Sequence, residues 1–344
     1  GNQYKVDKHR VIFTINPASY GGGRFDNPIF KAFPSIYFGH ASNDHLIACL
    51  KIKLKQIIKN EQFKNLEYRL SLQLVLEEIV KGLRNVQANK KINSYFSIRD
   101  TETVLLNYLS LKFKNKDKDI YSTKVDDKRL LAQALYECFS GLLKETNDKK
   151  QYINDLSSQL NIDISSLLDN LFSSKLGYKK IGELIVPDSR SQPYFLLEML
   201  MRIRNMQIDG MNFGKQGIWF EGPSGIGKST LAIAYLKEKC IDYVKLNVGS
   251  KGVYKNLKNA FHEGKVVILD EINVDKNLEK LLGQLLTGVD SKGNKAKQPG
   301  FTVIATSNPI YDEENKKIFK NRSNLSIAFK NRMFVVPLND FSAE

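Results

Sequence analysis

The sequence predicts an α/β protein, with a parallel β-sheet in its C-terminal half and a mostly α-helical N-terminal half. In the C-terminal half, strand-like apolar runs alternate with helix-like segments, the pattern of parallel strands joined by helical crossovers. In the N-terminal half, apolar residues recur at three- and four-residue intervals, as on the buried side of amphipathic helices. With 344 residues, 42% of them apolar, the chain is long enough for two or more domains.

The chain opens with a strand-like segment followed by a long helical region. Residues 10–24 form an apolar run that ends in Asn16-Pro17 and three glycines, which predicts a buried strand delivering an asparagine to a loop. Between residues 41 and 91 the apolar spacing is helical, with Leu66, Leu70 and Ile79 among the recurring positions.

Two further helices are predicted before residue 150. Ser97 has the position of an N-cap before a helix that begins at residue 98. A polar break at residues 114–127 separates this helix from a second one at residues 128–144. Residues 147–151 are hydrophilic and are predicted to form a turn.

Residues 152–192 contain short apolar clusters separated by serines and aspartates, and we expect two short helices that act as a connector. Pro193 then opens a strongly apolar helix that ends near Asn205. This helix is expected to pack on the sheet of the C-terminal half.

A glycine-rich loop lies between a strand-like run at residues 217–220 and a helix-like run that starts at Ser229. It matches the pattern G-x-x-x-x-G-K-[ST], in which successive backbone N–H groups and the helix N-terminus point at one anion. Lys228 is expected to reach the β- and γ-phosphates of a nucleoside triphosphate, and Ser229 to bind Mg²⁺. The predicted nucleotide-binding residues are Gly222, Pro223, Ser224, Gly225, Ile226, Gly227, Lys228, Ser229 and Thr230.

Strand and helix alternate again after this loop. Residues 243–247 are a candidate strand, and residues 253–262 a helix that ends at Gly264, a good C-terminal cap. The next run, residues 266–269, is fully apolar, as in a strand buried on both faces, and Asp270 and Glu271 follow it. We expect Asp270 to hold Mg²⁺ and Glu271 to orient or deprotonate an attacking water.

A further strand at residues 301–305 also ends in polar residues, Thr306, Ser307 and Asn308. The side-chain amide of Asn308 can offer a donor and an acceptor to the γ-phosphate and the attacking water. The connection before this strand, residues 287–300, is basic, and we interpret it either as a plain exposed loop or as one that contacts a substrate or partner.

Composition restricts the environment and the partners of the chain. The formal net charge of +15 leaves a nucleic-acid partner open, although the lysines are spread along the sequence and no RNA-binding or zinc-finger signature is present. No apolar run approaches about 18 residues, so we expect no membrane span. Cys49, Cys138 and Cys240 are isolated, which favours a reducing compartment, cytoplasmic or nuclear. An exported effector remains open.

Residues 214–338 resemble the nucleotide-binding core of a AAA+ ATPase. Within them, residues 261–273 and 325–334 are similar to signatures of midasin, dynein and MoxR-type modules. The resemblance implies ATP (or ADP) with Mg²⁺ as ligands, Asn308 as the first sensor, and Arg332 as an arginine finger inserted into the nucleotide site of the neighbouring module. Glu271, Asn308 and Arg332 are then the catalytic residues, and Ser229 and Asp270 the metal ligands.

The same comparison applies to the start of the chain. Residues 12–24 resemble the first-sensor strand of a preceding module, residues 97–100 the second-sensor start of its helical lid, and residues 133–150 the last helix of that lid. Ile36 falls where Arg332 falls in the second module, so the first module lacks an arginine finger.

These resemblances predict four regions in a tandem-module fragment of a larger protein. They are residues 1–40, the end of a preceding AAA+ core; 41–150, its α-helical lid; 151–192, a helical connector; and 193–344, a P-loop core without its own lid. We expect an ATPase module, weakly active alone, of a ring-forming dynein- or midasin-like motor that remodels a protein or ribonucleoprotein partner. Adjacent AAA+ modules are the other expected partners.

Three alternatives remain open. They are a nucleic-acid motor such as a hexameric helicase or a McrB-like GTPase, the ATPase core of a larger ubiquitin ligase or effector, and a scaffold that binds nucleotide without turnover.

Overall fold

The computed structural model describes most of the chain from residue 41 onward. The described residues are 41–58, 72–88, 98–114, 124–140, 146–164, 178–187, 190–207, 214–309, 311–312, 317–318 and 325–338. The strand predicted at the start of the chain, Ile36 and the whole predicted region 1–40 lie outside them. None of the described helices is long and apolar enough to cross a membrane.

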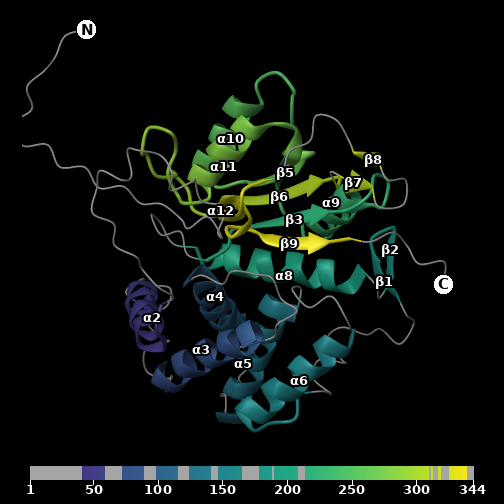
Figure 1. Ribbon diagram of the computed structural model, residues 1–344. Helices are drawn as coiled ribbons and strands as arrows, with labels where there is room; N and C mark the ends of the chain where they lie inside the picture. Colours follow the sequence, from purple (N-terminus) through teal and green to yellow (C-terminus); the bar gives the residue numbers. More distant parts are fainter. Residues whose placement is uncertain are drawn as a thin grey trace, which may run out of the picture.

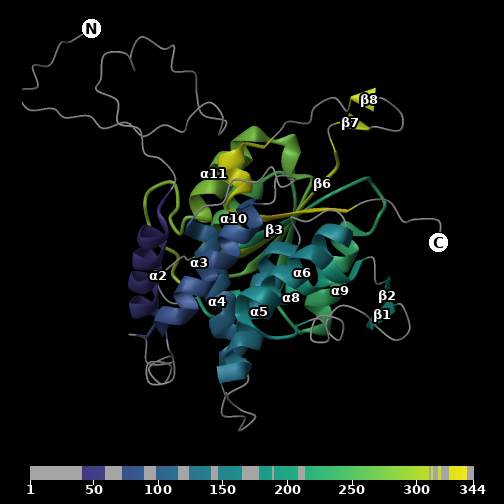
Figure 2. The same cartoon turned by 60° about the horizontal axis from the view of Figure 1, so that its bottom comes forward.

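The N-terminal half is a bundle of helices, as predicted (Figures 1 and 2). The bundle comprises α2 (Asn43–Ile58), α3 (Leu72–Ala88), α4 (Ile98–Lys114), α5 (Lys124–Phe139) and α6 (Thr146–Leu160). The central helix α4 is buried along nearly its whole length, and α2, α3 and α5 pack against it.

Two boundaries in the bundle differ from the prediction. Helix α5 begins inside the predicted polar break, and α6 covers residues 147–151, where a turn was expected. In α6, Tyr152, Leu156 and Leu160 are buried at four-residue spacing against the bundle. This apolar stripe supports the helix, and the polar residues before it form the exposed first turn, with Asp148 favourably placed near the helix N-terminus.

The predicted connector at residues 151–192 is not entirely helical. Its described part contains the end of α6 and an antiparallel hairpin of β1 (Tyr178–Ile181) and β2 (Leu184–Pro187). The two-residue turn has Gly182 at φ 57°, a left-handed conformation that glycine adopts without strain. The expectation of two short helices is therefore wrong for residues 178–187, and residues 165–177 lie outside the described residues.

The C-terminal half contains the predicted parallel sheet. Its strands are β3 (Gly217–Glu221), β4 (Tyr243–Asn247), β5 (Val266–Asp270), β6 (Thr302–Ser307) and β9 (Phe334–Pro337). They lie in the order β4-β5-β6-β3-β9, and every pair is parallel. All five strands therefore end at the same edge of the sheet, where an open α/β sheet binds its ligands.

Helices cover both faces of this sheet (Figure 1). Residues 218 and 220 of β3 pack with α8 (Ser191–Asn205) and α9 (Lys228–Glu238), whereas Trp219 packs on the opposite face with α10 (Val253–His262) and α11 (Lys276–Leu285). The apolar residues of β5 are completely buried because both faces are covered.

Helix α8 joins the bundle to the sheet, and its buried side contacts α4 and α5 as well as β3. An ion pair crosses the boundary: Arg202 Nη2 lies 2.5 Å from Glu137 Oε2, and the same nitrogen donates to Asn107 Oδ1 at 3.2 Å. Asn107 Nδ2 in turn donates to Glu137 Oε2 at 2.7 Å. One apolar cluster runs continuously from the bundle into the sheet, so the two halves share a core.

A second contact fixes the bundle just before β3. The backbone N–H groups of Gly214 and Lys215 donate to Glu102 Oε2 at 3.0 Å and Thr103 Oγ1 at 2.9 Å, both on α4. Lys215 Nζ also lies 2.8 Å from Asp100 Oδ1. The first turns of α4 therefore hold the segment from which the central strand starts.

Helix α10 ends as predicted. Gly264 has φ 64°, and a Cβ atom there would lie 2.1 Å from the carbonyl oxygen of Pro299, so only glycine fits. Arg204 Nη2 donates to the Gly264 carbonyl at 3.0 Å, and its Nε donates to that of Gly300 at 2.8 Å. The C-terminal turn of α8 thus secures the end of α10 and the end of the 287–300 connection.

The 287–300 connection is an ordered turn built around Asp290. Its Oδ1 accepts the backbone N–H groups of Lys292 at 2.8 Å and Asn294 at 2.9 Å, and Oδ2 lies 3.4 Å from His262 Nε2. The backbone N–H of Asn294 is the main cause that lowers the pKa of Asp290 to about 2, with smaller contributions from the Asn294 side chain, Lys292 and His262.

Glu137→Leu should lower the free energy of unfolding by about 3 kcal/mol, because it leaves Arg202 as an uncompensated buried charge. The double variant Glu137→Leu/Arg202→Leu should recover most of this loss, leaving a deficit of about 1–2 kcal/mol from the unpaired Asn107 amide. Urea denaturation measures all three proteins. Glu238→Leu, at an exposed site on α9, is the control and should change stability by less than about 0.5 kcal/mol. A double variant that is at least as destabilised as Glu137→Leu would contradict the interpretation.

The low pKa of Asp290 predicts the pH range over which its turn is stabilised. The usual aspartate pKa is about 3.9, so the carboxylate contributes stability above that pH, and the contribution is lost as the pH falls toward about 2. A ¹³C NMR titration of the Asp290 carboxyl group should have its midpoint near 2. Asp290→Ala should speed amide hydrogen exchange at Lys292 and Asn294 at neutral pH. A midpoint near 4 would show that the turn does not hold the ionised form.

Candidate functional site

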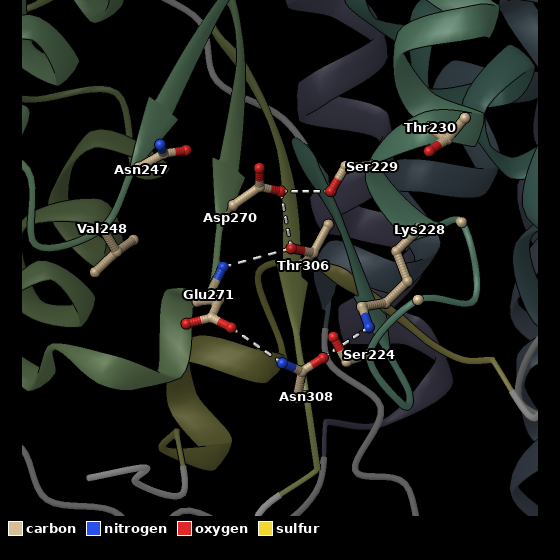
Figure 3. Close-up of a pocket in the computed structure, with 12 residues that line it drawn as sticks. Ser224, Lys228, Ser229, Thr230, Asn247, Val248, Asp270, Glu271, Thr306 and Asn308 are labelled. Atoms are coloured by element: carbon tan, nitrogen blue, oxygen red, sulfur yellow. Dashed lines mark hydrogen bonds between the residues drawn. The ribbon is translucent and has the colours of Figure 1, made fainter.

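A polar pocket lies at the carboxyl edge of the sheet, where β3, β4, β5 and β6 end (Figure 3). Its lining residues come from the loop after β3, the first turn of α9, and the ends of the other three strands. They are Ser224, Gly225, Gly227, Lys228, Ser229, Thr230, Asn247, Val248, Asp270, Glu271, Thr306 and Asn308. The parallel pairing thus brings together side chains that are up to 84 positions apart in sequence, from 224 to 308.

The predicted glycine-rich loop winds tightly around the start of α9. Its first residue, Gly222, lies so close to the chain after β9 that a Cβ atom would be 2.2 Å from the Leu338 carbonyl oxygen. The loop ends at Gly227, with φ 80°, directly before the first residue of α9. The N-terminus of this helix lies at the pocket, and the N–H groups of a helix N-terminus form a natural site for an anion.

Lys228 is held by three acceptors. Its Nζ donates to the carbonyl oxygens of Gly222 at 2.6 Å and Pro223 at 2.5 Å, and to Asn308 Oδ1 at 2.9 Å. The side chain is only 8% exposed. A buried ammonium group is therefore fixed beside the helix N-terminus, and both favour a negatively charged ligand.

Asp270 is surrounded by donors on three elements. Oδ1 accepts the hydroxyl groups of Ser229 at 2.5 Å and Thr306 at 3.1 Å, and Oδ2 lies 2.9 Å from Lys245 Nζ on β4. Burial opposes ionisation, but these hydrogen bonds and the charge of Lys245 outweigh it and lower the pKa of Asp270. The carboxylate is therefore ionised at neutral pH.

Glu271 and Asn308 form the other side of the pocket. Asn308 Nδ2 donates to Glu271 Oε1 at 3.0 Å, so one side-chain amide contacts Lys228 through its oxygen and Glu271 through its nitrogen. The carbonyl of Asn308 accepts Asn273 Nδ2 at 2.9 Å. Glu271 has φ 61°, a left-handed conformation that is costly for a residue with a side chain and is typically retained at functional positions.

The predicted residues fall into two groups. Most of them line the pocket, but Gly222, Pro223, Ile226 and Arg332 do not. Gly222 and Pro223 supply carbonyl oxygens to Lys228, and Ile226 is buried in the core. Thr306, Asn247, Val248 and Lys245 were not among the predicted site residues. The sequence could have predicted Thr306, since it belongs to the polar triplet that ends β6. It could not have predicted Lys245 and Asn247, because their position depends on the pairing of β4 with β5.

The oxygen atoms that Ser229 and Asp270 offer as ligands fit Mg²⁺. A hydroxyl and a carboxylate oxygen already lie 2.5 Å apart, and hard oxygen ligands of this type suit Mg²⁺, which keeps most of its coordination for water and phosphate. Within the described residues no group of three or more His, Cys, Asp or Glu side chains is arranged to hold a metal ion. The protein ligands fit a metal that arrives with phosphates better than an all-protein cage.

Arg332 is not brought to this pocket. Its carbonyl oxygen accepts the backbone N–H of Gln216, directly before β3, so it lies at the amino edge of the sheet. The length of β3, about 16 Å for five residues, separates this edge from the pocket. Burial lowers the pKa of Arg332, as does the nearby guanidinium of Arg99 on α4, whereas Glu279 on α11 raises it.

Trp219, the single tryptophan of the chain, links the two edges. Its indole Nε1 donates to Ser307 Oγ at 2.7 Å, next to Asn308. The ammonium group of Lys330 also lies close to the ring, with Nζ 5.2 Å from its centre. Lys330 belongs to α12 (Ile327–Lys330) and precedes Arg332 by two positions.

A comparison with known families matches residues 218–331 to AAA, the ATPase family associated with various cellular activities. No curated protein matches the chain. The matched segment runs from the central strand to the residue before Arg332 and includes every residue that lines the pocket. Together with the parallel sheet, it supports an α/β AAA+ core with ATP binding and ATPase activity in the C-terminal half.

Proposed function

We propose that residues 193–344 bind ATP with Mg²⁺, hydrolyse it, and form one module of a larger dynein- or midasin-like ring motor that remodels a protein or ribonucleoprotein partner. The observation that carries this proposal is the hydrogen-bonded series Lys228–Asn308–Glu271 at the end of a parallel sheet. It joins a phosphate-binding lysine to a carboxylate that can act on water. A scaffold that only stores nucleotide requires the lysine but not the carboxylate.

The central polar groups of the pocket have separate tasks in this proposal. The loop N–H groups and Lys228 bind the β- and γ-phosphates, and Ser229 and Asp270 hold Mg²⁺. When bound, Mg²⁺ neutralises charge on the phosphates. Glu271 accepts a proton from the attacking water, and the Asn308 amide fixes the orientation of the Glu271 carboxylate while its oxygen contacts Lys228.

Two arginines support the tandem arrangement. Arg99 on α4 and Arg332 before β9 are 233 positions apart, yet close enough for the charge of one to lower the pKa of the other. Both lie where the bundle meets the amino edge of the sheet, away from the pocket of this module. Arginine side chains bind phosphate groups well, so these two residues suit an anionic ligand. We assign that ligand to the nucleotide of a preceding module, with residues 41–150 as its lid and Arg332 as its arginine finger.

The proposal also includes the partners, the cellular location and the region boundaries expected from the sequence. Adjacent AAA+ modules, in the same or another chain, are the proposed partners of the amino edge. We retain a reducing compartment, cytoplasmic or nuclear, as the proposed location. The tandem boundaries at residues 40, 150 and 192 likewise stay predictions.

Lys228→Ala should abolish ATP binding, because it removes the buried positive charge that the phosphates contact. Glu271→Gln should keep ATP binding and slow hydrolysis by about 10²-fold or more, since a neutral amide cannot accept the proton of the water. Equilibrium binding of a fluorescent ATP analogue and steady-state phosphate release measure the two effects. If Lys228→Ala retains wild-type affinity, the loop is not the binding site.

The chain alone should hydrolyse ATP slowly, at about 0.1 s⁻¹ or less, because no arginine is among the described residues that line its pocket and an arginine finger contributes roughly 10³–10⁵-fold. Phosphate release by monomeric protein, isolated by size exclusion, measures this rate, and Lys228→Ala gives the background. Turnover above about 1 s⁻¹ by the monomer would contradict a site that needs a second module.

A further inference from the structure

The layer of α10, α11 and the 287–300 connection carries a group of exposed lysines. This layer covers the sheet on the face opposite α8 and the helical bundle (Figure 1). We call the group the basic face; its members are Lys251, Lys255, Lys276, Lys280, Lys292, Lys295 and Lys297, all exposed.

Two side-chain contacts join the three elements of the basic face. Lys258 Nζ on α10 donates to Ser291 Oγ in the 287–300 connection at 3.0 Å. Tyr254 OH, also on α10, donates to Asp275 Oδ2 at 2.5 Å, directly before α11. The Asp290 turn gives the connection its own internal order. The lysines therefore project from a scaffold whose parts are fixed relative to one another.

The acidic residues of the same layer contact groups other than the ammonium groups of these lysines. Asp275 caps α11 through the N–H of Asn277, Glu279 accepts the N–H and hydroxyl of Ser326, and Asp290 is buried within its turn. In the described part of the chain, no carboxylate lies within ion-pair distance of any lysine of the basic face. The lysines of the basic face therefore carry positive charge that is not held in ion pairs with the described residues, and such charge attracts polyanions.

We propose that the basic face binds a single strand of nucleic acid through its phosphate backbone. Three features favour a nucleic acid over an acidic polypeptide. Lys255 and Lys258 are three positions apart on α10, about 4.5 Å along its axis, so they lie on the same side of the helix. Exposed amides, among them Asn256 and Asn259, stand beside the lysines and can donate to phosphate oxygens.

The third feature is an exposed aromatic ring next to Lys255 in sequence. Tyr254 is 39% exposed, and its hydroxyl is held by Asp275, so the ring is fixed where a base can stack on it. Positive charge combined with aromatic stacking is a usual means of binding a single strand without sequence preference. An acidic polypeptide would use the lysines but would gain nothing from the ring.

The test is fluorescence anisotropy with a labelled oligouridine over a range of salt concentrations. We expect wild-type binding to weaken steeply with salt, because about 0.7 counterions are released per phosphate neutralised on a single strand. The triple variant Lys251→Glu/Lys255→Glu/Lys295→Glu should bind roughly tenfold or more weakly and lower the salt slope by about 2. The matched control reverses three exposed lysines elsewhere, Lys51, Lys55 and Lys237, and has the same net charge.

Variants of Tyr254 distinguish binding of a nucleic acid from binding of other polyanions. Tyr254→Leu should weaken binding by about fivefold with an unchanged salt slope, whereas Tyr254→Phe, which keeps the ring, should bind nearly as wild type. Unchanged thermal unfolding midpoints show that the variants are folded.

Three results would overturn the proposal. One is an equal loss in the control and test triple variants, which would mean that net charge alone decides binding. The second is an absence of salt-dependent binding by the wild type. The third is displacement of the strand by polyglutamate of the same length at equal concentration, with no effect of Tyr254→Leu, which would assign the face to acidic polypeptides.

Discussion

The site depends on one constraint, the position of β6 between β3 and β5 in a fully parallel sheet. Because parallel strands end at a common edge, this order places Asn308, at the end of β6, between the loop after β3 and the acids after β5. A single side-chain amide can then contact Lys228 on one side and Glu271 on the other. In an antiparallel arrangement the same residues would emerge at opposite edges.

Much of this arrangement could be predicted from the sequence, since it depends on local patterns with a strong physical basis. The glycine-rich loop specifies its own shape, and a fully apolar strand followed by Asp270 and Glu271 predicts both burial and the edge at which the acids emerge. The end of α10 was predictable too, because Gly264 marks a left-handed C-terminal cap. The AAA match over residues 218–331 agrees with these inferences.

What the sequence did not predict depends on contacts between distant elements. Lys245 reaches Asp270 only because β4 pairs with β5 in one register. The first turn of α6 reads as a hydrophilic turn, and becomes helix because Tyr152 and Leu156 are buried against the bundle. The hairpin at residues 178–187 is short and weakly patterned, and Gly182 in its turn is its main local signal. The approach of Arg99 to Arg332 likewise arises from the packing of α4 on the segment before β3.

The environment of Trp219 has a practical consequence. As the only indole in the chain, it touches Ser307, the neighbour of Asn308, and lies under the ammonium group of Lys330, close to Arg332. The emission of an indole responds to its hydrogen-bond partner and to nearby charge. The protein therefore contains an intrinsic optical probe positioned between the pocket at one edge of the sheet and the arginine at the other. Ligand binding at either edge can therefore be followed by the fluorescence of one native side chain, without a label or a substitution.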